Sequence, residues 1–249
     1  MRIREFAAAL IVAVVVTSVA GGQAHAEFVT AAELEGFLSL PAGSLDAITV
    51  QGAIGGSALR LTVAASAGDI LSFDWNFLTD ENFNAQSFND LAFVTLGTQV
   101  DILADVYSST FVPSMTPFFD ETGYRSFSLT FAAAGTFTVG IGVLEVGDEL
   151  FDSALLLDDF ALSGAGLPGG GFEGGFARFA SIGDARIVTA AFGATPTEGI
   201  RQAVLTTAVP EPASLTLVAA GALTGLAGCA VRRRQQRGGP TSGDEAAVA

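Results

Sequence analysis

The chain has 249 residues, half of them hydrophobic, and a formal net charge of −15. Residues 27–209 contain 22 acidic side chains, five arginines and no lysine, a net charge of −17. A field of that sign repels nucleic acid and anionic lipid or glycan surfaces, and it suits cations, neutral glycans or simple solubility.

Residue types that several kinds of catalysis require are missing from this central stretch. The only histidine is His25 and the only cysteine is Cys229, and both belong to terminal segments. This excludes a Ser-His-Asp triad, a cysteine nucleophile, disulfides and zinc sites that need His or Cys, and the absence of lysine excludes Schiff-base chemistry. Enzymatic options are reduced to paired carboxylates and carboxylate-bound hard metals.

The first residues have the composition of an export signal. Arg2 and Arg4 precede an apolar stretch over residues 6–19, and small and polar residues follow as far as Ala24-His25-Ala26. This pattern predicts a signal peptide over residues 1–26 that signal peptidase cleaves after Ala26, with Ala24 and Ala26 as the small residues of the site. A retained anchor is the alternative, but the apolar run is about 14 residues, short of the roughly 20 that span a bilayer.

A short helix is expected next. Thr30 and Glu33 have the spacing of a capping box, and Leu34, Phe37 and Leu38 give the following turns an apolar face. We expect this face to cover one edge or end of the domain.

Most of the remaining chain alternates apolar with small polar residues, which is typical of half-buried strands. Phe73, Trp75 and Phe77 form one apolar row, so Trp75 is expected in the core. Strands are predicted at residues 58–65, 71–77, 91–96, 100–106, 127–131, 137–143, 154–162, 186–192 and 200–206. This pattern indicates an all-β fold over residues 27–207, an antiparallel β-sandwich of jelly-roll type.

A glycine-dense stretch, residues 164–175, has seven glycines in twelve residues. A phosphate-binding loop of the Walker type needs a lysine, which the chain lacks, so we interpret the stretch as a flexible connector inside the domain.

Acidic and amide side chains gather around two turns of the predicted sandwich. Calcium needs six to eight oxygen ligands, and a site at the end of a sandwich would stiffen its loops. The candidate ligands are Asp74, Asp80, Glu81, Asp90, Asp148 and Asp158. Asp74 is the strongest candidate, because an acid between Phe73 and Trp75 either faces outward or is held by a ligand. The spacing does not match an EF-hand, so the pattern permits calcium without requiring it; a solvated acidic surface is the alternative, and no other cofactor is indicated.

Two other functions are compatible with a jelly roll. A carbohydrate-binding module would need exposed aromatic platforms, for which Tyr107 and Tyr124 are the available residues. A carboxylate-dependent glycosidase would need a facing pair of acids, and the adjacent Asp158 and Asp159 would point to opposite faces of a strand.

The last part of the chain combines three features. Pro210-Glu211-Pro212 precedes an uncharged stretch over residues 213–231, and Arg232, Arg233 and Arg234 follow it. Nineteen helical residues extend about 28 Å, close to the thickness of the hydrocarbon core, so we predict a transmembrane helix. The arginines would lie in the cytoplasm, which agrees with export of the preceding domain.

These features together resemble the PEP-CTERM sorting signal of Gram-negative bacteria, here over residues 208–237. The resemblance implies that Pro210, Glu211 and Pro212 are recognised by exosortase, a membrane cysteine protease, and that the protein passes through an inner-membrane intermediate to the cell surface or extracellular matrix. It also implies a non-catalytic role, with association with neutral exopolysaccharide. Residues 238–249 form a short polar tail beyond the point where the family usually ends.

The central domain has a resemblance of its own. Residues 45–162, with Gly68-Asp69-Ile70-Leu71-Ser72-Phe73-Asp74-Trp75, Phe88-Asn89-Asp90 and Asp152-Ser153-Ala154-Leu155-Leu156, look like the β-rich ectodomain of unknown function in many PEP-CTERM proteins. Residues 172–207 look like the segment that usually opens that ectodomain, which suggests a circular permutation. Such a permutation requires neighbouring chain ends.

Overall fold

The computed structural model describes residues 29–81, 88–107, 109–147, 150–163, 167 and 170–207. The predictions that lie outside the described residues are the signal peptide over 1–26 with Ala24 and Ala26, the candidate ligand Asp148, part of the connector, the sorting residues Pro210, Glu211, Pro212, Arg232, Arg233 and Arg234 with the span 213–231, and the tail over 238–249. Within the described ranges, none of the helices is both long and apolar enough to cross a membrane.

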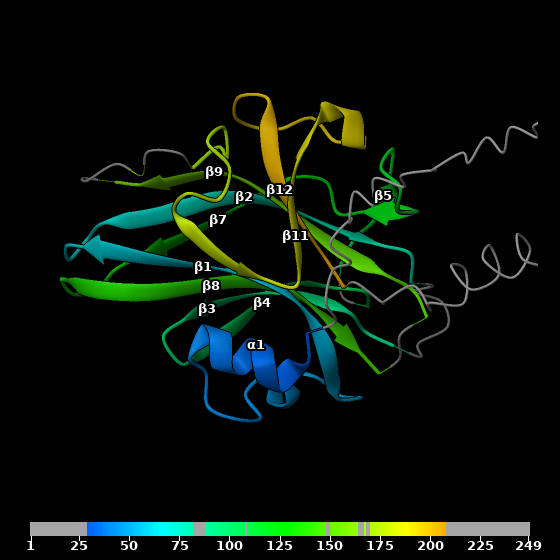
Figure 1. Ribbon diagram of the computed structural model, residues 1–249, viewed down its shortest axis with the longest axis horizontal. Coiled ribbons are helices and arrows are strands. Elements are labelled where there is room, and N and C mark those ends of the chain that lie inside the picture. The colour runs from blue at the N-terminus through cyan, green and yellow to red at the C-terminus, as the bar shows by residue number, and fades with distance from the viewer. Residues whose placement is uncertain are drawn as a thin grey trace, which may run out of the picture.

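The described residues form two antiparallel sheets (Figure 1). The first sheet has the order β10-β1-β8-β3-β4, with bounds Phe179–Ile182, Ala53–Ala65, Gly135–Val146, Leu91–Leu96 and Gln99–Asp105. The second has the order β11-β12-β9-β2-β6-β5, with bounds Asp184–Thr189, Arg201–Thr206, Ser153–Leu162, Ile70–Thr79, Asp120–Glu121 and Val112–Pro113, and β7 (Arg125–Thr130) also pairs with β2. The predicted antiparallel all-β class is confirmed, and the jelly-roll type stays a prediction.

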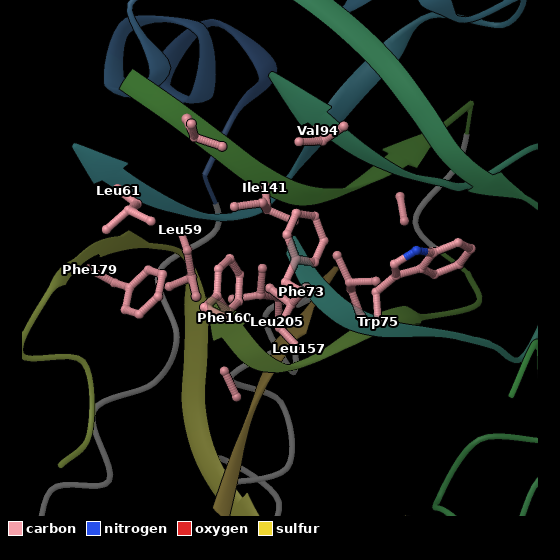
Figure 2. Close-up of a cluster of buried hydrophobic side chains, with 14 of the residues drawn as sticks. Leu59, Leu61, Phe73, Trp75, Val94, Ile141, Leu157, Phe160, Phe179 and Leu205 are labelled. Atoms are coloured by element: carbon pink, nitrogen blue, oxygen red, sulfur yellow. The ribbon is translucent and has the colours of Figure 1, made fainter. Parts of the chain in front are cut away.

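A single large core fills the space between the sheets. Figure 2 shows Val94 and Ile141 from the first sheet facing Phe73 and Leu157 from the second. Phe73 stacks on Phe160 with ring centroids 4.7 Å apart. Trp75 belongs to the same cluster, as its position in the apolar row predicts.

Helix α1 (Ala31–Leu38) begins with the predicted capping box. The Glu33 amide donates to the Thr30 hydroxyl at 3.3 Å, and the Thr30 amide donates to the Glu33 carboxylate at 2.9 Å. The helix covers the outer face of the first sheet rather than an edge or end (Figure 1). The reason is that this face carries apolar side chains of its own, such as Phe93 and Leu144, which Leu34 and Leu38 bury.

The predicted strand over residues 186–192 is shorter than expected at its end. Strand β11 stops at Thr189, whose hydroxyl accepts a hydrogen bond from the Ala191 amide at 3.3 Å. A 3-10 turn over Ala190–Phe192 follows and ends at Gly193, where φ is 108°. A further 3-10 turn, Asp46–Ile48, lies between α1 and β1.

Residues 170–172 of the glycine-rich stretch are buried, which differs from the expected flexible connector, whereas Glu173 and Gly174 are exposed. Phe172 is fully buried and stacks on Phe179 with centroids 5.0 Å apart. A side chain at Gly170 would collide with the Phe160 carbonyl. The glycines therefore allow the chain to pass close to β9 while it delivers an aromatic ring to the core.

The two ends of the described chain lie close together. The Gly56 amide donates to the Val29 carbonyl at 2.9 Å, and the next residue, Ser57, donates from its hydroxyl to the Thr206 carbonyl at 2.6 Å. Strands β11 and β12 belong to the second sheet through pairing of β12 with β9. Neighbouring ends are what a circular permutation needs, and the permutation itself stays a prediction.

The close packing of the first sheet can be tested at Gly142. A Cβ there would lie 2.6 Å from the Phe93 ring and 2.8 Å from the Ser57 carbonyl oxygen. We expect Gly142→Ala to lower the free energy of unfolding by about 1–3 kcal/mol in denaturant titrations. Gly36→Ala in α1 is the matched control, because nothing lies within 4 Å of its added Cβ. It should raise stability by up to about 1 kcal/mol, and equal losses in both variants would contradict this packing.

Candidate metal centre

Three carboxylates lie at positions where the two-residue alternation of the strands predicts side chains that point into the core. In β8 the inward side chains Val139, Ile141 and Val143 are followed, two residues on, by Glu145. Asp90 similarly precedes the inward residues Ala92 and Val94 of β3, and Glu81 continues the row of Phe77 and Thr79 beyond the end of β2. Because inward positions recur every second residue, all three acids lie at the same end of the space between the sheets.

These three residues form the carboxylate cluster: Glu81, Asp90 and Glu145, each of which offers an oxygen within 4.8 Å of the others. All three are buried, and Glu145 is only 1% exposed. Two oxygens bound to one calcium ion at 2.3–2.6 Å can be at most about 5 Å apart. The cluster therefore has the dimensions of a calcium site without any movement of its backbone.

Backbone and hydroxyl groups hold the acids in place. The Val146 amide donates to Asp90 Oδ1 at 2.9 Å, which ties the start of β3 to the end of β8. The Glu81 amide donates to the Thr79 hydroxyl at 2.9 Å, and that hydroxyl lies 3.0 Å from the Ser153 hydroxyl of β9. The cluster thus joins strand ends from both sheets.

Glu145 is the least compensated member of the cluster. Neither of its carboxylate oxygens has a hydrogen-bond partner within normal geometry among the described residues. Burial, and after it the charges of Asp90, Asp152 and Glu81, raise its pKa from 4.5 to about 10, while the nearby Thr207 hydroxyl acts to lower it. Without a cation, Glu145 therefore keeps a proton at neutral pH.

The ligand set selects one class of ion. Three carboxylates provide up to six oxygens when each binds through both, and calcium accepts that number in irregular geometry. Zinc and the softer transition metals favour nitrogen or sulfur ligands, which the cluster lacks. Magnesium prefers a regular octahedron and retains several of its waters, which suits an enclosed site poorly.

Of the five predicted calcium ligands that lie among the described residues, the structure brings together two, Glu81 and Asp90. Asp80 lies beside them in the chain, but its Oδ1 accepts a hydrogen bond from the Phe119 amide at 2.7 Å. Burial is the main cause that raises its pKa. Asp74 lies on the outer face of the second sheet and accepts a hydrogen bond from the Ser126 hydroxyl at 2.6 Å.

Asp158 lies directly across from Asp74 in the register of β9 and β2. Its Oδ2 accepts hydrogen bonds from the Thr197 amide at 2.7 Å and the Glu198 amide at 2.9 Å, so it fixes the loop before β12. Burial raises its pKa against these hydrogen bonds. Asp158 is buried and Asp159 is exposed. Asp159 has a φ of 49° and lies at the register shift of β9 against β2, so the expected simple alternation of faces does not apply to this pair.

Sequence reasoning missed Glu145, the residue that completes the cluster. The sequence-based prediction places the candidate acids around turns, whereas Glu145 lies inside strand β8. The sequence signal that could have found it is the alternation in β8. Every second residue up to Val143 points into the core, and Glu145 is the next one. The same alternation in β3, followed two residues back from inward-pointing Ala92, identifies Asp90.

The aromatic residues that could stack on a sugar do not form a platform in the described parts of the chain. Trp75 is 5% exposed within the core, and Tyr124 packs on the cluster around Phe118. Tyr107 is exposed, but it lies beside Glu81, whose charge adds to partial burial in raising the tyrosine pKa. This arrangement favours the metal centre over a carbohydrate site.

The raised pKa of Glu145 gives the metal-free protein a characteristic pH dependence. The folded state holds a proton that the unfolded state releases above its ordinary carboxyl pKa, so raising the pH from 4.5 toward about 10 favours unfolding. In thermal melts with a chelator, we expect the melting temperature to fall across this range and Glu145→Gln to flatten the slope. Asp101→Asn on exposed β4 is the matched control. If Glu145→Gln and the wild type have the same slope, Glu145 is not protonated in the folded state.

No protein-family model, curated protein or solved structure matches this chain. Its function must therefore be inferred from the carboxylate cluster and from the two terminal segments.

Proposed function

We propose that this protein is a non-catalytic, exported surface protein whose β-domain is stabilised by a calcium ion in the carboxylate cluster. One observation carries the calcium site: Glu145 is 1% exposed, has no hydrogen-bond partner among the described residues, and points an oxygen to within 4.8 Å of Glu81 and Asp90. Ionising Glu145 in this enclosure would be strongly destabilising, and a bound cation would offset that cost.

The burial of the cluster supports a structural role for the ion. A catalytic metal keeps a position open for water or substrate, whereas a structural site is closed by its ligands. Glu81, Asp90 and Glu145 are all at most 6% exposed, and they hold strand ends of both sheets. An ion in this position would cross-link the ends of strands from the two sheets.

Export and sorting form the second part of the proposal. The signal peptide would bring residues 27–207 across the inner membrane, where calcium would reach the cluster. The segment 208–237 would then hold the protein in the membrane until an exosortase-type protease processes it near Pro210-Glu211-Pro212. The mature domain, in our proposal a jelly roll, would become part of the cell surface or of an extracellular matrix that contains neutral exopolysaccharide.

Calcium binding should be visible as a stability change. At a concentration 100-fold above the dissociation constant, an ion that binds only the folded state adds about 2.7 kcal/mol. For a domain of this size that corresponds to a rise in melting temperature of roughly 5–10 °C. We expect the wild type to show this rise with calcium, and a smaller one with magnesium.

Two variants make the measurement specific. Glu145→Gln should melt near the wild type without calcium, because Glu145 is then protonated, and should lose the calcium-dependent rise. Asp74→Asn, which removes a predicted ligand that lies away from the cluster, should keep it. A calcium shift that survives Glu145→Gln, or no shift in the wild type at millimolar calcium, would refute the site.

The sorting proposal is tested by the ends of the mature chain in the native host. We expect intact mass and terminal sequencing to find a protein that runs from Glu27 to near Pro210. The Glu211→Ala variant should retain the segment through Ala249, because the motif that the protease reads is lost. If wild type and variant both retain Arg232–Arg234, the chain is an ordinary single-span membrane protein.

A further inference from the structure

Exposed apolar side chains gather at the end of the domain where the chain leaves it. We name Tyr107, Phe119, Leu150 and Phe151 the apolar rim; they are 39%, 70%, 76% and 46% exposed. Large exposed apolar residues that occur singly need no explanation, but a contiguous group marks an interaction surface.

Hydrogen bonds around Asp80 place the segments that carry the rim near one another. The Asp80 amide donates to the Asp152 carbonyl at 3.0 Å, next to Phe151. The Asp80 carboxylate accepts from the Phe119 amide at 2.7 Å. Tyr107 lies close enough to Glu81 for that charge to raise the tyrosine pKa. Tyr107, Phe119 and Phe151 are thus placed around residues 80 and 81, and Leu150 precedes Phe151 in the chain.

The point where the described chain ends lies directly beside the rim. The Thr207 amide donates to the Ser153 carbonyl at 2.9 Å, and the Ser153 amide donates to the Thr207 hydroxyl at 2.8 Å. Ser153 is two residues from Phe151. In Figure 1 this end of the molecule is on the right, where β5 is labelled.

The length of the following segment limits how far this end can be from a membrane. Five residues separate Thr207 from Ala213, where the predicted span begins. Even fully extended, they reach at most about 20 Å. The opposite end of the domain is a further 30 Å or so away, the length of the ten-residue strand β2. The rim is therefore the face that a tethered domain would turn toward the lipid.

We infer that the apolar rim rests on the lipid surface while the tail holds the protein in the membrane. This inference depends on the membrane span of the proposed function. Aromatic rings that carry a polar group favour the headgroup region, and Tyr107 fits that preference. Phe119, Leu150 and Phe151 supply exposed apolar area that lipid can cover. The acidic domain would be repelled by anionic lipid, so the partner is a zwitterionic or neutral lipid surface.

Tryptophan fluorescence in the full chain tests the contact. Phe151→Trp places a reporter in the rim, and Ile70→Trp, at a site 43% exposed at the start of β2, is the matched control at the far end. Each variant is reconstituted with its tail into phosphatidylcholine vesicles that contain brominated acyl chains, and the emission of the wild type, from buried Trp75, is subtracted. We expect roughly half of the emission added by Phe151→Trp to be quenched, because interfacial side chains lie about 5–10 Å deep, and little of the emission added by Ile70→Trp.

The other outcomes separate the rim from the proposal on which it depends. A chain that floats with the vesicles but shows equal, weak quenching in both variants retains its membrane tail and overturns the lipid contact. A chain that does not float overturns both. If the reporter of the Phe151→Trp variant becomes protected from iodide without vesicles as the protein concentration rises, a second copy covers the rim and the lipid contact is again overturned.

Discussion

The enclosure of three carboxylates within 4.8 Å of one another, between two sheets, is the constraint on which this end of the domain depends. Burial disfavours a charged carboxylate, and neighbouring like charges add to that cost. The domain can meet the constraint with a proton on Glu145 or with a cation shared by all three acids. Only the cation pulls the strand ends together, because a proton neutralises a charge without bridging the others.

The position of the cluster gives the cation a mechanical role. Glu145 belongs to the first sheet, and Glu81 lies two residues after Thr79, the last residue of β2 in the second. The Thr207 hydroxyl lies close to Glu145, while reciprocal hydrogen bonds join Thr207 to Ser153. Any force on the tail therefore enters the domain at the site where an ion would join its two sheets. A calcium-loaded cluster would resist the separation of the two sheets better than a protonated one.

Local sequence patterns predicted most of the fold. Particular residues show which features such patterns cannot predict. The capping box at Thr30 and the strand over 91–96 were predicted to the residue, because each depends on neighbours in sequence. The two-residue strands β5 and β6 were missed, since they exist only through pairing of β6 with β2 and of β5 with β6. Asp74 was a poor ligand candidate for a reason visible in its own strand: between inward Phe73 and Trp75, it faces away from the core. Only tertiary contact reveals that Glu81, Asp90 and Glu145 meet.

The negative charge of the whole domain and the carboxylate cluster both make the stability of the fold depend on cations. An excess of negative charge lowers the stability of a compact state by self-repulsion, and it raises the local concentration of cations around the surface. Inside a cell, where free calcium is scarce, the first effect would dominate and the cluster would be filled by protons. Outside the membrane, the second effect would supply the ion that joins the sheets. If the domain is exported as proposed, the same composition that makes it hard to stabilise before export would help to complete it afterwards, beside the lipid surface on which we propose that its apolar rim rests.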